Sequence, residues 1–182
     1  MTQAEIFKKD MKHSNRITWL HHQSYPGSEH GMVFVCHLKC NERGSLKPYD
    51  EAAYKGEYMI NDSYSRHWCG YVGVPSGHPY YRVGYMDSLY GGADNMWDIE
   101  GHTHGGITYT DHFQEWGDKF WFIGFDCSHS QDLNSWSEVQ DETCHKKGDM
   151  VRKFRTKEYA KKVVNGMLKE LVLNFNNNLS GG

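Results

Sequence analysis

The chain has 182 residues, of which 14% are aromatic, and its formal net charge at pH 7 is -3. This length suits one domain, and the slightly acidic charge excludes the broad positive field that attracts duplex DNA or an anionic membrane. No apolar run could span a bilayer, and the polar first residues lack the apolar segment of a secretory signal. We therefore expect one cytoplasmic domain that binds neither a membrane nor duplex nucleic acid.

The first third of the chain predicts short elements. Residues 4–11 are expected to form a helix, residues 31–36 a strand after a turn, and residues 51–54 a second short helix. The five cysteines are odd in number and dispersed, so we expect reduced thiols rather than a disulfide framework.

Three central segments predict strands, at residues 68–74, 99–109 and 119–126. Their β-branched and aromatic content, bounded by glycine, proline and polar clusters, favours sheet over helix. From Tyr159 to Phe175 an apolar residue recurs every four positions, which predicts an amphipathic helix about 30 Å long. The sequence thus predicts a single α+β domain at residues 1–175, with a flexible tail at 176–182. A long C-terminal helix would pack on a central, mostly antiparallel, twisted sheet.

A His-x-His pair lies on the second predicted strand. His102 and His104 would project from the same face of a strand and could bind zinc with a third ligand from elsewhere. The candidates for that third ligand are His78, His112, Asp126 and His129. The metallo-β-lactamase pattern continues differently after this pair, so that resemblance fails and zinc binding stays an alternative.

The polar run 126–132 follows the third predicted strand directly. His129 is close in sequence to Asp126 and Asp132, either of which could orient it as a general base. Cys127 is an alternative nucleophile, although a lone cysteine in such a run is more often a small buried residue.

A tyrosine-rich connection follows the first predicted strand. His78 precedes a proline, which favours extended backbone and a ring on a loop above the sheet. Tyr80, Tyr81 and Arg82 could stack on a base or hold a phosphate, and a packed aromatic lid without a ligand is the alternative.

Three motifs mark the centre of the chain: Cys-Gly-Tyr-Val and Pro-Ser-Gly-His-Pro within 69–79, His-Gly-Gly-Ile-Thr-Tyr at 104–109, and Gly-Phe-Asp-Cys-Ser-His-Ser-Gln-Asp at 124–132. Together they resemble a family of small phage- and prophage-encoded proteins of unknown function. The family pattern contains the equivalent of His104 but not of His102, which weakens the zinc hypothesis. The resemblance therefore favours a site made of His78, His104, Asp126, His129 and Asp132.

The resemblance implies a protein of an infected or lysogenic bacterial host, and we expect an anti-defence factor that acts on a small nucleotide-like ligand. In the leading hypothesis it hydrolyses a cyclic nucleotide or oligonucleotide phosphodiester without a cofactor. His104 and His129 would share the acid and base roles, and Asp126 would orient one imidazole. Arg82 or a backbone amide near Gly105 would balance the phosphate charge. The expected ligand contacts are His78, Tyr80, Tyr81, Arg82, Gly105, Gly106, Thr108 and Asp132.

Three alternatives remain open at this point. A binding protein would sequester the same ligand without turnover. A zinc-dependent hydrolase would use His102 and His104. An interaction protein would present its aromatic surface to a host protein. Self-association is compatible with each of them.

Overall fold

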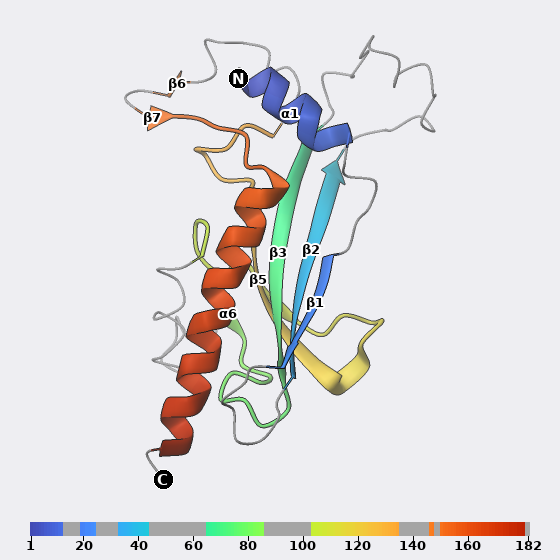
Figure 1. The fold of residues 1–182 in the computed structure, drawn as a ribbon, viewed down its shortest axis with the longest axis vertical. Helices are drawn as coiled ribbons and strands as arrows, with labels where there is room; N and C mark the ends of the chain where they lie inside the picture. Colours follow the sequence, from blue (N-terminus) through green and yellow to red (C-terminus); the bar gives the residue numbers. More distant parts are fainter. Residues whose placement is uncertain are drawn as a thin grey trace.

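Five strands form the main sheet, in the order β1-β2-β3-β5-β4, and every neighbouring pair is antiparallel (Figure 1). The strands are β1 (Trp19–Ser24), β2 (Val33–Arg43), β3 (Ser65–Pro75), β4 (Tyr109–Asp111) and β5 (Phe120–Asp126). This computed structural model describes residues 1–12, 19–24, 33–43, 65–85, 103–134, 146–147 and 150–180.

The long helix α6 (Lys157–Ser180) lies along one face of the sheet and contacts β2 and β3 (Figure 1). The other elements within the described ranges are helix α1 (Gln3–Lys12), the 3-10 helix η1 (Gly117–Lys119), and the paired strands β6 (Lys146–Lys147) and β7 (Met150–Val151). The predicted α+β class, with its C-terminal helix on an antiparallel sheet, is confirmed. No helix among the described residues is long and apolar enough to cross a membrane.

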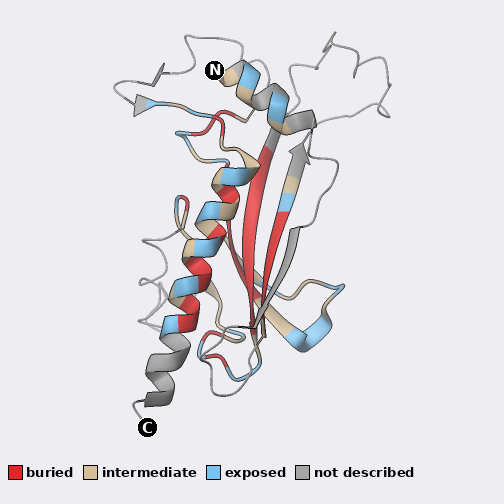
Figure 2. Ribbon diagram, viewed as in Figure 1, coloured by how far each residue is buried: buried red, intermediate tan, exposed pale blue. Residues whose placement is uncertain are grey.

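The main core lies between α6 and the sheet. Buried residues follow one side of the helix, namely Ala160, Val164, Met167, Leu168, Leu171 and Val172. Figure 2 shows this buried side facing the sheet, with β3 buried along most of its length. Each large apolar side chain that is fully buried contributes about 1.5–3 kcal/mol. At Gly70 the helix comes so close that a Cβ atom would lie 2.5 Å from Val164 Cγ2.

An aromatic layer covers the opposite face of the sheet. Tyr71 and Phe122 point away from α6 and pack against Phe113, which follows β4. The ring centroids of Phe113 and Phe122 are 4.4 Å apart, and those of Phe113 and Tyr71 are 4.9 Å apart. Both faces of β3 are buried, and the strand is accordingly apolar from Trp68 to Val74 rather than alternating.

Most predicted elements are confirmed, with shifted ends. Helix α1, strands β3 and β5 and helix α6 match the predictions for 4–11, 68–74, 119–126 and the C-terminal segment. The strand predicted at 31–36 begins at Val33 and continues to Arg43. Residues 51–54 lie outside the described part of the chain. The segment predicted as a flexible tail is helical as far as Ser180.

The strand predicted at 99–109 is wrong for residues 103–108 and confirmed at Tyr109, where β4 begins. Residues 103–106 form bends, and Tyr109–Asp111 pairs with β5. The cause is the backbone of Gly105 and Gly106, whose φ angles of 72° and 102° are incompatible with a regular strand.

Asp10 connects α1 to the sheet and to the start of α6. Its carboxylate accepts hydrogen bonds from Trp68 Nε1 at 2.6 Å and from the backbone N–H of Lys157 at 3.2 Å. That amide is in the first turn of α6, where backbone donors have no partner within the helix. One carboxylate therefore fixes three elements.

We expect Asp10→Ala to lower the free energy of unfolding by about 1–3 kcal/mol, because two donors lose their acceptor. Urea denaturation measures the difference. The neighbouring exposed Lys9→Ala variant should stay within about 0.5 kcal/mol of wild type. Equal stability of the two variants would contradict the connecting role of Asp10.

Candidate acid-base site

A buried carboxylate, Asp132, organises the site. Its Oδ2 atom accepts hydrogen bonds from His104 Nε2 at 2.7 Å and from the backbone N–H of His129 at 3.0 Å. Its Oδ1 atom accepts a hydrogen bond from Arg155 Nε at 2.8 Å. The Asp132 side chain is fully buried, so these three donors replace its solvent.

The protonation of Asp132 follows from this environment. Burial acts to raise the pKa of the carboxyl group, but the hydrogen bonds from His104, Arg155 and the His129 amide together lower it below 3.8, its ordinary value. The group is therefore a carboxylate at neutral pH. A carboxylate only accepts hydrogen bonds, so His104 Nε2 carries the proton of that contact.

Short backbone contacts place Asp132 beside the segment before α6. Leu133 N–H donates to the Lys153 carbonyl at 3.0 Å, and Lys153 N–H donates to the Gln131 carbonyl at 3.1 Å. Arg152 Nη2 also donates to the Asp132 carbonyl at 2.9 Å. These contacts bring the end of the 126–132 turn next to Arg155.

Tyr159 enters the site from the first turn of α6. Thr156 caps the helix, since its Oγ1 atom accepts the Tyr159 N–H at 3.1 Å. The Tyr159 hydroxyl lies 2.9 Å from His104 Nδ1, and the Arg155 Cζ atom lies 4.9 Å from the centre of the Tyr159 ring. Burial raises the pKa of Tyr159, whereas the charge of Arg155 acts in the opposite direction.

His129 supplies a second imidazole. The ring centroids of His104 and His129 are 5.3 Å apart, and His129 Nε2 lies 3.9 Å from Asp126 Oδ1. His129 Nε2 is buried and has no hydrogen-bond partner among the described residues. Asp126 Oδ1 also accepts the Ser128 N–H at 2.9 Å, which fixes the start of the turn. A small movement would bring His129 within hydrogen-bond reach of Asp126.

Gly105 packs directly against His129. A Cβ atom at this position would clash with His129 Nε2, and the residue has a φ of 72°. The lack of a side chain thus allows the 103–106 bend to approach the imidazole. Of the residues predicted from the sequence, the structure brings together His104, Gly105, Asp126, His129 and Asp132.

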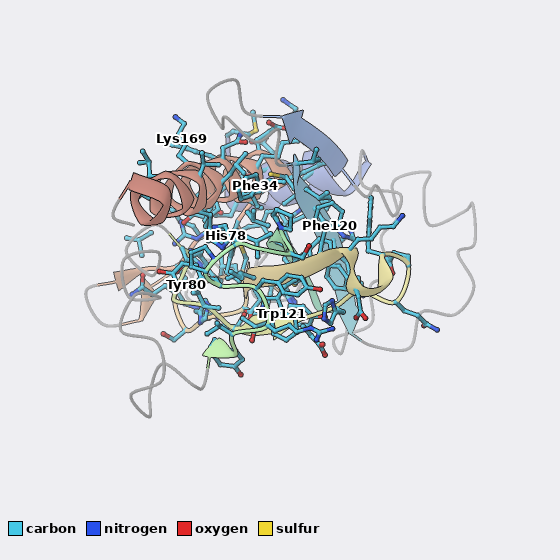
Figure 3. All side chains as sticks on the ribbon, turned by 90° about the horizontal axis from the view of Figure 1, so that it is seen from below. Phe34, His78, Tyr80, Phe120, Trp121 and Lys169 are labelled. Atoms are coloured by element: carbon cyan, nitrogen blue, oxygen red, sulfur yellow. The ribbon has the colours of Figure 1, made fainter. Side chains whose placement is uncertain are left out.

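His78 lies elsewhere, on the turn after β3 as predicted, but its ring is buried rather than standing above the sheet. Its Nε2 atom contacts the Leu171 carbonyl at 2.9 Å, and its Nδ1 atom accepts the Tyr80 N–H at 3.1 Å. Figure 3 shows His78 and Tyr80 by α6 and β5, away from the outward-pointing Lys169. Leu171 lies about 18 Å along the helix from Tyr159. His78 and the buried Tyr80 are therefore separate from the His104 site.

Tyr81 and Arg82 lie at the beginning of β5, whereas the acid-base site lies at its end. Arg82 forms an ion pair with Asp118 at 3.4 Å, and the Tyr81 hydroxyl donates to the Asp118 carbonyl. The seven residues of β5 separate its two ends by about 20 Å. Arg155, and not Arg82, brings positive charge to the site.

Thr108 and Gly106, the other two predicted ligand contacts, lie in surroundings that differ from those of the imidazoles. The Thr108 N–H donates to the Gly124 carbonyl at 2.9 Å, which extends the pairing with β5. A Cβ atom placed on Gly106 would meet no described atom within 4 Å. Neither residue contacts the imidazoles through an interaction that the structure records.

The zinc and cysteine alternatives gain no support from this geometry. His102 lies outside the described residues, and both ring nitrogens of His104 contact protein groups. Within the described ranges no group of three or more His, Cys, Asp or Glu side chains could hold a metal ion. Cys127 is 2% exposed, and burial raises the pKa of its thiol, which keeps it protonated and unreactive.

No family model, curated protein or solved structure matches this chain. The site must therefore be interpreted from its own chemistry. Sequence reasoning missed Arg155 and Tyr159, which lie outside the three motifs. Thr156 was the available signal, since a threonine before an amphipathic segment predicts a cap and places Tyr159 in the first turn.

Gly105 and Gly106 provide a matched pair of substitutions. Alanine at either position should cost about 1–2 kcal/mol, because both residues have positive φ. Only Gly105→Ala also creates a clash with His129. We expect it to be the less stable variant and to move the His129 ring signals in an NMR spectrum, whereas Gly106→Ala should leave them in place. Identical His129 signals in both variants would contradict the packing described above.

The buried His78 predicts a pH dependence of stability. Burial lowers its pKa below 6.5, its ordinary value, although the hydrogen bond to Leu171 acts in the opposite direction. As the pH falls below 6.5, the unfolded chain takes up a proton that the folded protein does not, so stability decreases. His37 is affected in the same direction, because burial also lowers its pKa.

We expect His78→Gln to lose part of this decrease, so that its free energy of unfolding varies less steeply with pH below 6.5. Urea denaturation at a series of pH values measures the slope. Lys169→Gln, at an exposed position on α6, should keep the wild-type slope. An unchanged slope in His78→Gln would show that His78 takes up its proton equally in both states.

Proposed function

We propose that this protein hydrolyses a phosphodiester bond in a small nucleotide-like ligand, with a cyclic nucleotide or oligonucleotide as the preferred class. The observation that carries the proposal is the pair of imidazoles 5.3 Å apart, one of them bound to a buried carboxylate. Two imidazoles this close together can both come within hydrogen-bond reach of one phosphoryl group bound at their edge, one as base and the other as acid.

The two histidines have different roles in the proposed reaction. His104, oriented by Asp132, is the base that accepts a proton from the group that attacks phosphorus. His129 is the acid that gives a proton to the leaving oxygen. Overall, one water oxygen bonds to phosphorus and one phosphorus–oxygen ester bond breaks, which yields a phosphate monoester and a free hydroxyl group.

Positive charge near the site supports an anionic ligand. Arg155 lies beside Tyr159 with its Nε atom bound to the Asp132 carboxylate. Arg152 donates to the Asp132 carbonyl, so two guanidinium groups lie beside one carboxylate. These two features would balance the phosphate charge, a role that the sequence assigned to Arg82. The choice of a cyclic nucleotide comes from the resemblance to phage and prophage proteins. Cyclic nucleotides are signals in bacterial immunity, and a phage protein that hydrolyses them would counter that immunity.

The direct test is incubation with a panel of cyclic mono-, di- and trinucleotides, followed by mass spectrometry of the products. We expect a linear or monomeric phosphate product from at least one member. His129→Gln should slow its formation by about 10²- to 10⁴-fold, because the leaving oxygen loses its acid. Ser130→Ala, at an exposed position in the same turn, should keep the wild-type rate. Intact ligands across the panel would exclude this substrate class.

A second candidate function is binding of the same ligand without turnover. One observation favours it: both ring nitrogens of His104 contact protein groups, so neither is directly open to a ligand. A sequestering protein should show a melting temperature that rises with ligand concentration while the ligand is recovered unchanged. Release of a cleaved product would exclude this candidate.

A further inference from the structure

Tyr159, His104 and Asp132 form one chain of hydrogen bonds. The Tyr159 hydroxyl is 2.9 Å from His104 Nδ1, and His104 Nε2 is 2.7 Å from Asp132 Oδ2. This is the order of a nucleophile, its base and the group that orients the base. We propose that Tyr159 is the nucleophile of this site and that the reaction passes through a covalent phosphotyrosine intermediate. The inference rests on the proposed phosphodiester hydrolysis and names its attacking group.

The positions of the protons follow from Asp132. Its carboxylate holds the His104 proton on Nε2, so the neutral ring has its lone pair on Nδ1. Among the described residues, the group that lies at that lone pair is the Tyr159 hydroxyl, which therefore donates to it. Activation of a water molecule by His104 would first require displacement of this hydroxyl. Attack by Tyr159 requires no such displacement.

Burial raises the pKa of the Tyr159 phenol, so its hydroxyl keeps its proton until His104 accepts it, and the charge of Arg155 opposes this effect in part. The Arg155 guanidinium lies 4.9 Å from the ring centre, and the residue belongs to the first turn of a 24-residue helix. Two hydrogen bonds fix that turn, from Tyr159 N–H to Thr156 Oγ1 and from Lys157 N–H to the Asp10 carboxylate. The nucleophile is thus held in one position before any ligand binds.

The reaction then has two displacements at phosphorus. In the first, Tyr159 Oη bonds to phosphorus as its proton passes to His104 Nδ1, and the ester oxygen leaves with a proton from His129. In the second, water attacks the phosphotyrosine. The water proton passes to His129, the phosphorus–Oη bond breaks, and Tyr159 takes back the proton from His104. Both histidines return to their starting states.

Bis(p-nitrophenyl) phosphate is a suitable probe, because its cleavage releases a coloured product. Rapid mixing should show a burst of nitrophenol equal to the amount of protein, and acid quenching should trap a nitrophenyl phosphate group on the peptide that contains Tyr159. Tyr159→Phe removes only the hydroxyl group and should lose both signals. Tyr109→Phe, which removes a phenol hydroxyl on the opposite face of the sheet, should keep both.

A stereochemical measurement covers the case in which the intermediate does not accumulate. A nucleoside p-nitrophenyl phosphorothioate of one configuration is hydrolysed in water labelled with heavy oxygen. Two displacements retain the configuration at phosphorus, whereas direct attack by water inverts it. Retention is the expected result.

The outcomes separate this inference from the proposed function. Inversion at phosphorus, or cleavage by Tyr159→Phe at the wild-type rate, would overturn the role of Tyr159 and leave the hydrolysis proposal standing. Failure of the wild-type protein to cleave either the probe or the cyclic nucleotides would overturn both. Retention together with an inactive, folded Tyr159→Phe variant would support both.

Discussion

The buried carboxylate of Asp132 is the interaction on which the site depends. A carboxylate without solvent is strongly destabilising unless hydrogen bonds and an opposite charge replace its water. His104, Arg155 and the His129 amide do this from three separate segments of the chain. Their arrangement is therefore fixed by the need to neutralise one charge. The same requirement holds His104 in the tautomer that the proposed chemistry uses.

The fold places the Asp132 carboxylate where the end of strand β5 meets the beginning of helix α6. Strand β5 ends at Asp126, α6 begins at Lys157, and the pairing of residues 131–133 with Lys153 joins them. Strand β3 packs against α6 on one face and against the aromatic layer on the other, so the framework that carries these polar groups is closely packed. Element ends are also where backbone donors and side chains leave the core and become available to a ligand.

The sequence predicted most elements because their signals are local. The four-residue apolar period of α6 and the aromatic content of β5 lie within short windows. It also predicted that His104, His129 and Asp132 share a site. It could not pair Arg155 with Asp132 or Tyr159 with His104, which are 23 and 55 residues apart. Those contacts depend on tertiary packing, and the period of the helix places Tyr159 among its apolar residues.

The separation of His78 from the His104 site could not be predicted from the sequence for a related reason. The following proline predicted a ring on a loop above the sheet, and His78 does lie in a turn, but a buried imidazole is tolerated when both nitrogens have partners. The Leu171 carbonyl and the Tyr80 amide are those partners, and one of them comes from a residue 93 positions away. Composition alone cannot distinguish this structural histidine from a reactive one.

The two histidines of the site differ in the way that acid-base chemistry requires. His104 is held between a carboxylate and a phenol at hydrogen-bond distances, so its tautomer is defined by its neighbours. His129 has a weaker contact with Asp126, at 3.9 Å, and a buried nitrogen with no partner among the described residues. A ring with a fixed tautomer suits the base that activates a fixed nucleophile. A group with an incomplete set of partners can respond to a ligand, which suits the acid.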